Sequence, residues 1–394
     1  MNTPKIRFKG FEDDWEQRKL GEIVLRESLA RESTIDLPYV EYEDVIAEEG
    51  RINKDIRKKE GIKKGIFFDG SQVLYGKLRP YLHNWLNPDF SGVAVGDWWV
   101  LKPNNVDKNF IYRLIQTQQF DDIANQSTGS KMPRADWNLV SNTEFAIPTS
   151  QVEQTKIGGY FSTLDNLITL HQRKCDETKQ LKKFMLQKMF PKNGEKNPEL
   201  RFEGFMDDWE QRKLNEIADV RDGTHDSPKY VQEGHPFITS KNVSNGFINY
   251  DEVQYITDVD YEEINKRSKV DVHDILMGMI GTIGNLALIR QKPDFAIKNV
   301  ALIKYTGDVD YQYLYQTLQV DCVTRQLFTG MDGGTQKFVS LKKIRELGIP
   351  FTEEQEQQKI GQYFEDLDNL ITLHQRKCEK LKELKNFMLQ NMFV

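Results

Sequence analysis

Cysteine is scarce in this chain of 394 residues, which contains only Cys175, Cys322 and Cys378. No two of them form a CxxC pair, and none lies at a metal-binding spacing from histidine. The usual zinc and redox motifs are therefore excluded, and no metal site is predicted. An unpaired cysteine behaves as a small apolar side chain, so we expect three reduced, buried thiols.

Long apolar runs are also missing. The chain is 38% apolar, which suffices for packed cores, but no stretch approaches the length of a membrane span. Residues 1–10 have neither an apolar signal core nor a small-residue cleavage site, so no secretory peptide is visible and a cytoplasmic location is expected. The length favours two or three folded units.

Positive charge is not in excess. The net charge is −6, and the two most divergent stretches, 24–146 and 218–348, are each slightly acidic. Affinity for nucleic acid depends on where cations point, and a partner can supply part of the phosphate neutralisation. Bulk charge therefore neither supports nor excludes DNA as a ligand.

Catalytic motifs are absent as well. The sequence has no GxxxxGK[ST] phosphate loop and no glycine-rich turn spaced for a dinucleotide or S-adenosylmethionine. The tetrapeptide at 87–90 differs from the Asn-Pro-Pro-aromatic motif of amino-methyltransferases at Asp89, and it is interpreted as a turn. Neither Pro88-Asp89 nor Pro293-Asp294 is followed at short range by the Glu-x-Lys of a carboxylate nuclease. No catalytic residue and no cofactor are predicted for this chain.

What the sequence does contain is an internal repeat. Residues 13–20 recur unchanged as 207–214, and 164–175 recur unchanged as 367–378. The stretches between these blocks diverge, although both finish on Ile-Pro, at 147–148 and 349–350. Two copies are too few for a solenoid, so two halves in a pseudo-two-fold arrangement are predicted.

The second repeated block predicts a long helix in each half. Apolar positions spaced alternately by four and three residues are typical of a coiled-coil seam. At 1.5 Å per residue, a helix of about 38 residues would be about 57 Å long. We expect the two helices to pair antiparallel and to separate the two divergent domains. The predicted seam comprises Ile157, Phe161, Leu164 and Ile168, and then Ile360, Phe364, Leu367 and Ile371.

The divergent stretches predict a mixed α/β fold. Short β-rich runs occur at 65–68, 73–75, 93–95 and 97–101, and again at 236–239, 275–277, 286–290 and 300–305. Helical stretches are predicted at about 109–126 and 311–327. The predicted segments are a first domain at 1–148, a long helix at 149–190, a linker and second domain at 191–348, and a long helix at 349–394.

This order of motifs resembles the specificity subunits of type I restriction-modification systems over essentially the whole chain. The resemblance rests on Tyr75–Leu82, on its counterpart Met277–Gly284, on Gly333–Ser340, and on the Asp-Trp-Glu openings at Trp15 and Trp209. In the first half, residues 129–134 depart from the Gly-Thr-Gln form of the second half.

The resemblance implies a DNA reader that binds no cofactor. Each of two target-recognition domains would read one half of a bipartite, asymmetric double-stranded DNA site. Two modification subunits, which methylate adenine, and the restriction subunits would assemble on it. S-adenosylmethionine, ATP and Mg²⁺ would then belong to those partner subunits.

Cationic and polar residues in glycine- or proline-bounded turns are the predicted DNA contacts, although such residues are also common in solvated loops. They are Lys77, Arg79, Tyr81, Lys131 and Arg134, and in the second half Thr282, Asn285, Gln336 and Lys337. Two other interpretations remain open. A coiled-coil scaffold would show no DNA selectivity, and a self-sufficient DNA-modifying enzyme would be active alone.

Overall fold

A computed structural model of the chain describes residues 3–126, 131–244, 246–329 and 338–394. It divides into two compact units. Unit 1 comprises Met1–Arg173 and Gln375–Val394, and unit 2 comprises Lys174–His374. These boundaries differ from those of the predicted segments, because each long helix is divided between the two units. Within the described residues, no helix is long and apolar enough to cross a membrane.

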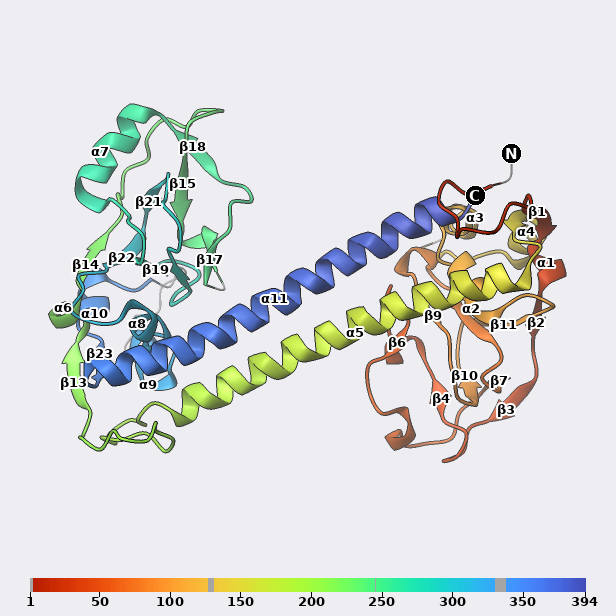
Figure 1. Cartoon of the computed structure of the whole chain (residues 1–394), viewed down its shortest axis with the longest axis horizontal. Helices are drawn as coiled ribbons and strands as arrows, with labels where there is room; N and C mark the ends of the chain where they lie inside the picture. The colour runs from red at the N-terminus through yellow and green to blue at the C-terminus, as the bar shows by residue number, and fades with distance from the viewer. Residues whose placement is uncertain (1–2, 127–130, 245, 330–337) are drawn as a thin grey trace. The chain divides into compact units, whose positions relative to one another are not determined.

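Two long helices carry the second repeated block. They are α5 (Gln151–Lys188) and α11 (Glu354–Met392), drawn as continuous ribbons in Figure 1. α5 ends just before Phe190 and Pro191, as the proline predicts. In unit 1, Cys378 of α11 contacts the carbonyl of Ile168 of α5, and in unit 2 Cys175 contacts the carbonyl of Ile371. As the residue number on α5 rises from 168 to 175, the number of the contacting residue on α11 falls from 378 to 371, which is the predicted antiparallel pairing.

Unit 1 is a mixed α/β domain built on two four-stranded sheets, with strand orders β2-β11-β8-β9 and β3-β7-β10-β4. All of its strand pairs are antiparallel except β10 with β4. Its elements are β1 (Glu16–Lys19), α1 (Leu20–Ile23), β2 (Val24–Glu27), β3 (Ala30–Glu32), β4 (Tyr39–Val40), η1 (Tyr42–Asp44), β5 (Val45–Ile46), β6 (Arg51–Ile52), η2 (Ile56–Lys58), β7 (Lys64–Phe68), β8 (Val73–Gly76), η3 (Pro80–Leu82), β9 (Trp85–Leu86), β10 (Gly92–Ala94), β11 (Trp98–Pro103), α2 (Lys108–Leu114), α3 (Gln118–Ala124), α4 (Trp137–Asn142) and β12 (Glu144–Ile147).

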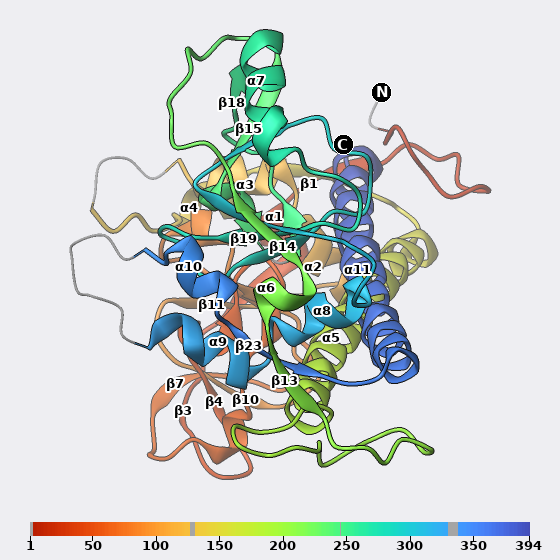
Figure 2. The ribbon, with the colours of Figure 1, turned by 90° about the vertical axis from the view of Figure 1, so that its left-hand side faces the viewer.

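Unit 2 repeats this plan with the sheet β14-β22-β19-β20 and a smaller sheet β18-β15-β21. Helix α7 packs against β21 and lies beside β15 and β18 (Figures 1 and 2). The elements are β13 (Glu210–Lys213), α6 (Leu214–Ile217), β14 (Asp219–Asp222), β15 (His235–Thr239), η4 (Ser240–Asn242), β16 (Val243–Ser244), β17 (Phe247–Ile248), β18 (Gln254–Ile256), α7 (Asp258–Ser268), β19 (Ile275–Gly278), β20 (Leu286–Leu288), β21 (Ala296–Lys298), β22 (Val300–Lys304), α8 (Tyr311–Thr317), α9 (Asp321–Phe328), α10 (Leu341–Arg345) and β23 (Gly348–Phe351).

Each predicted helix after the sheets is in fact two short helices. The stretch 109–126 breaks between α2 and α3, where the Thr117 side chain accepts from the Phe120 amide and begins the second helix. The stretch 311–327 breaks at the same place in the repeat, between α8 and α9. A side-chain cap begins α3 in unit 1, whereas α9 begins after Val320 without one.

The core of each unit is completed by the far end of a long helix. In unit 1, Phe393, which follows α11, stacks on Phe110 at 5.3 Å and meets Trp15 edge-on at 6.2 Å. In unit 2, Phe190, which follows α5, packs at 5.9 Å from Trp209. This packing gives the repeated tryptophan and the repeated helix ends a shared structural role.

Candidate functional site

The two segments of unit 1 that carry the predicted DNA contacts lie side by side. Leu78, in the turn after β8, forms an antiparallel bridge with Arg134. The Arg79 amide donates to the Pro133 carbonyl at 2.7 Å, and the Ala135 amide donates to the Lys77 carbonyl at 2.8 Å. Residues more than 50 positions apart in sequence thus form one surface, which we call the paired loops of unit 1 (77–82 and 131–135).

A carboxylate organises the cations of this surface. Asp97, just before β11, accepts from the Arg134 guanidinium at 3.0 Å, and the ammonium of Lys77 lies 3.5 Å away. The hydrogen bond from Arg134 holds the pKa of Asp97 below its usual value. The Tyr42 hydroxyl fixes the turn, because it donates to the Asp97 carbonyl at 2.6 Å and accepts from the Leu78 amide at 2.9 Å.

Three other predicted contacts project outward. Arg79 and His83 both have left-handed backbone, at φ 49° and 52°, and they flank the short helix η3. Such a conformation is uncommon for residues with a Cβ atom. Tyr81 is 53% exposed, and Lys131 is exposed. Within the described part of the chain, the side chains of Arg79 and Lys131 have no ion-pair partner, so both remain available to a ligand.

Unit 2 builds the same arrangement with different side chains. Ile280, in the turn after β19, forms an antiparallel bridge with Phe338, and the Val339 amide donates to the Met279 carbonyl at 2.9 Å. The Ser240 hydroxyl takes the place of the Tyr42 hydroxyl, because it accepts from the amides of Met279 and Ile280 at 3.1 and 3.3 Å. We call this surface the paired loops of unit 2 (279–285 and 338–340).

The predicted contacts of unit 2 are partly engaged within the unit. Thr282 donates to the Ser240 carbonyl, and Asn285 donates to the Val243 carbonyl at 3.3 Å. Both side chains are half-buried. Gln336 and Lys337 lie outside the described residues. Phe338, which is 65% exposed beside the turn, was not among the predicted contacts, although it lies within the Gly333–Ser340 motif.

The predicted seam residues divide into two groups. Ile157, Phe161 and Leu164 belong to the core of unit 1, and their counterparts Ile360, Phe364 and Leu367 belong to the core of unit 2. The fourth pair, Ile168 and Ile371, is half-buried where the cysteines of the opposite helix reach the backbone. The first group therefore anchors each helix in its own domain core.

A charged junction joins unit 1 to its helices. Asp165 of α5 accepts from Arg113 of α2 at 2.6 Å, and the ammonium of Lys385 of α11 lies 2.8 Å from it. Arg113 is only 2% exposed. Burial, with a further contribution from Arg113, lowers the pKa of Lys385 despite the attraction of Asp165.

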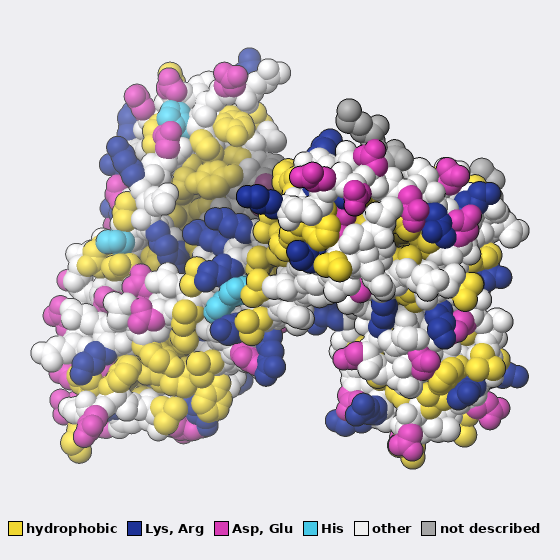
Figure 3. Space-filling view, turned by 45° about the vertical axis from the view of Figure 1, so that its right-hand side comes forward, with side chains coloured by type: hydrophobic (Ala, Val, Ile, Leu, Met, Phe, Trp, Pro, Cys, Tyr) yellow, Lys and Arg dark blue, Asp and Glu magenta, His cyan; other side chains and the backbone are white. Residues whose placement is uncertain are grey.

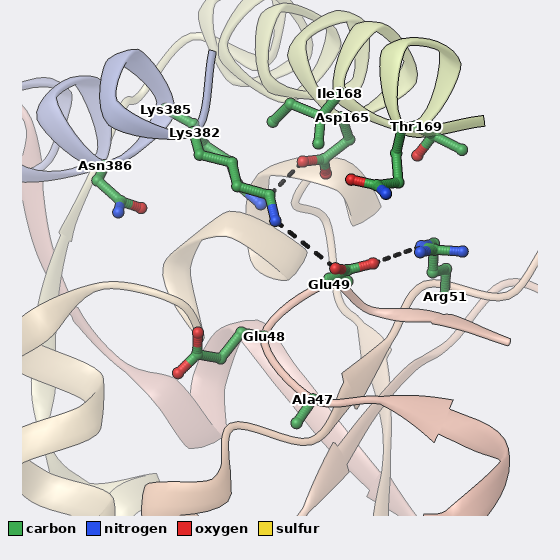
Figure 4. Close-up of a pocket in the computed structure, with 11 residues that line it drawn as sticks. Ala47, Glu48, Glu49, Arg51, Asp165, Ile168, Thr169, Lys382, Lys385 and Asn386 are labelled. Atoms are coloured by element: carbon green, nitrogen blue, oxygen red, sulfur yellow. Dashed lines mark hydrogen bonds and ion pairs between the residues drawn. The ribbon is translucent and has the colours of Figure 1, made fainter. Parts of the chain in front are cut away.

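A cavity of about 180 Å³ opens beside this junction (Figure 4). Glu49 lies 3.7 Å from Lys382 and 2.5 Å from Arg51 there. The charged lining residues are balanced, with three carboxylates and three cations: Glu48, Glu49, Asp165, Arg51, Lys382 and Lys385. The cavity therefore favours neither an anion nor a cation. Among the described residues, no cluster suited to holding a metal ion is found.

The exposed surface of the long helices carries apolar side chains in a repeated set. In unit 1 the set is Leu167, Leu170, Leu384 and Phe387, each between 37% and 53% exposed. Unit 2 presents the same set of three leucines and one phenylalanine at the repeated positions, Leu370, Leu373, Leu181 and Phe184, each between 44% and 50% exposed. We call these two sets the helix patches. Within each set, the two residues on one helix are three positions apart and so share a face of that helix, and exposed apolar side chains that gather on a surface are typical of interaction sites.

The surface charge of unit 1 is mixed. On the face seen at the right of Figure 3, Lys and Arg side chains are interspersed with Asp and Glu. That face offers no continuous basic groove, in keeping with the slightly acidic composition. A DNA contact on that face would therefore depend on individually placed cations.

Sequence comparison identifies relatives for both halves. The family model described as type I restriction modification DNA specificity domain matches residues 12–180 and 206–383. The type I restriction enzyme MjaVIII specificity subunit of Methanocaldococcus jannaschii is 22% identical over 290 residues, which are 71% of this chain and 67% of the relative. The MjaIX specificity subunit of the same organism is 26% identical over 193 residues, 48% of this chain and 44% of the relative.

Solved structures share the fold. The S subunit of a type I restriction-modification system from M. genitalium aligns with a TM-score of 0.67 at 14% identity, covering 100% of this chain and 99% of that one. A chain from a structural study of complex assembly in a type I R-M system aligns with a TM-score of 0.53 at 18% identity, covering 95% and 96%. At these identities the likeness concerns the fold alone.

Proposed function

Because the chain belongs to the type I restriction-modification DNA specificity family, we propose that it reads a bipartite, asymmetric DNA sequence, with unit 1 and unit 2 each reading one half. It is a specificity subunit, and its paired loops are the proposed contacts with base edges. The observation that carries this proposal is that the same loop pairing occurs in both units while its side chains differ. A common scaffold with variable side chains is what two different half-sites require, since base edges in the major groove differ in their donors, acceptors and methyl groups.

The proposed partners follow from the helix patches. Each unit presents Leu, Leu, Leu and Phe at repeated positions, so two copies of one partner could bind in the same way. We propose that these partners are two modification subunits that methylate adenine, and that restriction subunits join the assembly. S-adenosylmethionine, ATP and Mg²⁺ would be bound by those partners, and this chain would supply no catalytic group.

Two alternatives make different predictions. A coiled-coil scaffold would account for the helices but gives no reason for two divergent α/β units, and its assembled complex would bind scrambled and cognate duplexes equally. A self-sufficient DNA-modifying enzyme would methylate or cleave DNA as the purified chain. Methylation that requires an added modification subunit would exclude the second alternative.

Domain exchange tests the proposal directly. The chain is co-expressed with the modification subunit of its host, and methylated adenines are mapped across the genome. Replacing 218–348 with the matching segment of a related subunit should change one half of the recognised sequence. The matched control replaces 24–146 and should change only the other half. If either exchange altered both halves together, the assignment of one half-site to each unit would be refuted.

A further inference from the structure

The paired loops of the two units carry opposite chemistry at one matched position. Arg134 bridges Leu78 in unit 1, and Phe338 bridges Ile280 in unit 2. The next residue in each unit donates its amide to the residue before the bridged one, at 2.8 and 2.9 Å. The two positions are therefore equivalent in backbone hydrogen bonding, yet one holds a guanidinium and the other a phenyl ring.

The residue next to this position also loses its charge between unit 1 and unit 2. The Tyr42 hydroxyl donates to the carbonyl of Asp97, and the Ser240 hydroxyl donates to the carbonyl of Asn299 at 2.8 Å, which makes Asp97 and Asn299 equivalent. The carboxylate that holds Arg134 is thus a neutral amide in unit 2. The side-chain oxygen of Asn299 lies 2.6 Å from Nδ1 of His225.

The third charged residue of unit 1 is replaced as well. Lys77 directly follows β8, and Met279 directly follows β19. Met279 is 7% exposed and packs in the core of unit 2. The charges of Lys77 and Asp97 are therefore both absent at the equivalent described positions of unit 2, Met279 and Asn299.

Phe338 is held facing outward. Its neighbour Val339 is 2% exposed and belongs to the core of unit 2, so an extended backbone directs the two side chains to opposite sides. Phe338 itself is 65% exposed. The phenyl ring consequently stands on the surface of the paired loops with no charged residue at the positions equivalent to Lys77 and Asp97.

We propose that position 134/338 determines the class of base read by each unit, and that Phe338 contacts the C5 methyl group of a thymine in the second half-site. Among the four unmodified bases, thymine alone presents a methyl group in the major groove, and apolar side chains recognise it there. Arg134, oriented by Asp97, instead suits the O6 and N7 acceptors of guanine. This inference rests on the proposed function, because it requires the paired loops to face DNA.

Deoxyuridine provides the test, because it lacks only the methyl group of thymine. The complex assembled with the host modification subunits is titrated with duplexes in which each thymine of the second half-site is replaced in turn. We expect one position at which the replacement weakens binding about four-fold, which is the affinity that burial of one methyl group contributes. In Phe338→Ala this ratio should fall to about one, and in Phe338→Leu it should remain largely intact.

The matched control is Arg134→Ala, which should keep the thymine-to-deoxyuridine ratio and lose selectivity in the first half-site. A second half-site without thymine, an unchanged affinity for every substituted duplex, or a full ratio in Phe338→Ala would overturn the inference while leaving the proposed function intact. If Phe338→Ala does not assemble, the wild-type duplex series still tests whether a thymine methyl group contributes to binding, and Phe338→Leu still tests the side chain. A wild-type complex without any sequence preference would refute the proposed function, and the inference with it.

Discussion

The charged junction of unit 1 offers a sharp test of the packing because unit 2 contains a near-copy of it. In unit 2, Lys182 lies 2.7 Å from Asp368, and the neutral Gln316 donates to the same carboxylate at 2.8 Å. In unit 1 the position equivalent to Gln316 is Arg113. One carboxylate therefore balances two buried cations in unit 1 and only one in unit 2.

Asp165→Asn should consequently destabilise unit 1 more than Asp368→Asn destabilises unit 2. Removing one partner from a buried ion pair costs about 3–5 kcal/mol. Because Asp165 is 25% exposed beside the cavity, we expect the lower end, about 3 kcal/mol, for unit 1. We expect roughly half of that for unit 2, where a single cation is left unpaired. Adding Arg113→Gln to Asp165→Asn should recover about half of the loss.

Hydrogen exchange resolves the two units within one full-length chain. Peptides from 157–173 and 377–392 report on unit 1, and peptides from 177–190 and 360–373 report on unit 2. The pH dependence adds a second measurement. Since the folded pKa of Lys385 is lowered, the unfolded chain binds more protons, and the stability of unit 1 should rise as pH climbs through the folded pKa toward about 10.4.

In Asp165→Asn, which removes the attraction that raises the pKa of Lys385, this rise should begin at a lower pH. Equal loss of protection in both units after either single substitution would refute the reasoning. So would a double variant, Asp165→Asn with Arg113→Gln, that is less stable than Asp165→Asn alone.

Two further predictions concern the proposed contacts. Lys77→Ala with Arg79→Ala should weaken DNA binding by the assembled complex without preventing assembly; a guanine contact would relax selectivity at one position by about 1–3 kcal/mol, whereas a phosphate contact would reduce the salt slope by about one. Equal affinity of this variant and the wild type for cognate and scrambled duplexes at two salt concentrations would remove the turn from the interface. Leu170→Ser with Leu373→Ser, which alters one residue in each helix patch, should release the modification subunits in size-exclusion chromatography. Gln180→Ser with Glu383→Ser, at exposed repeated positions outside the patches, is the matched control, and co-elution of both variants with the partner would contradict the docking role.

The repeated frame could be predicted because identical residues in two copies must pack in similar surroundings. Trp15 and Trp209 each meet a phenylalanine from the end of a long helix, and both helices begin and end close to the predicted residues. The spacing of apolar residues did not reveal what those residues contact. Phe161 and Phe364 follow a coiled-coil pattern but lie in domain cores, because periodicity indicates which face of a helix is buried and not what covers it.

The candidate site could be predicted only in part. Glycine and proline marked the turn that carries Lys77 and Arg79, but the role of Asp97 depends on the pairing of β8 with β11 and on a bridge from Leu78 to Arg134. Such non-local register leaves no local signal in the sequence. For the same reason, the equivalence of Arg134 and Phe338 became visible only in the backbone hydrogen bonds.

The residues at the end of α11 complete the core of unit 1, and this affects the order in which the two units fold. The core of unit 1 contains Met392 and Phe393, which follow the whole of unit 2 in the sequence. At about 5–20 residues per second, synthesis of the roughly 200 intervening residues takes about 10–40 s. Unit 1 is thus the first to leave the ribosome and the last to be completed. Unit 2, whose residues are contiguous, can complete its core earlier. During that interval Trp15 and Phe110 lack the ring of Phe393, so apolar surface stays exposed on the nascent first domain.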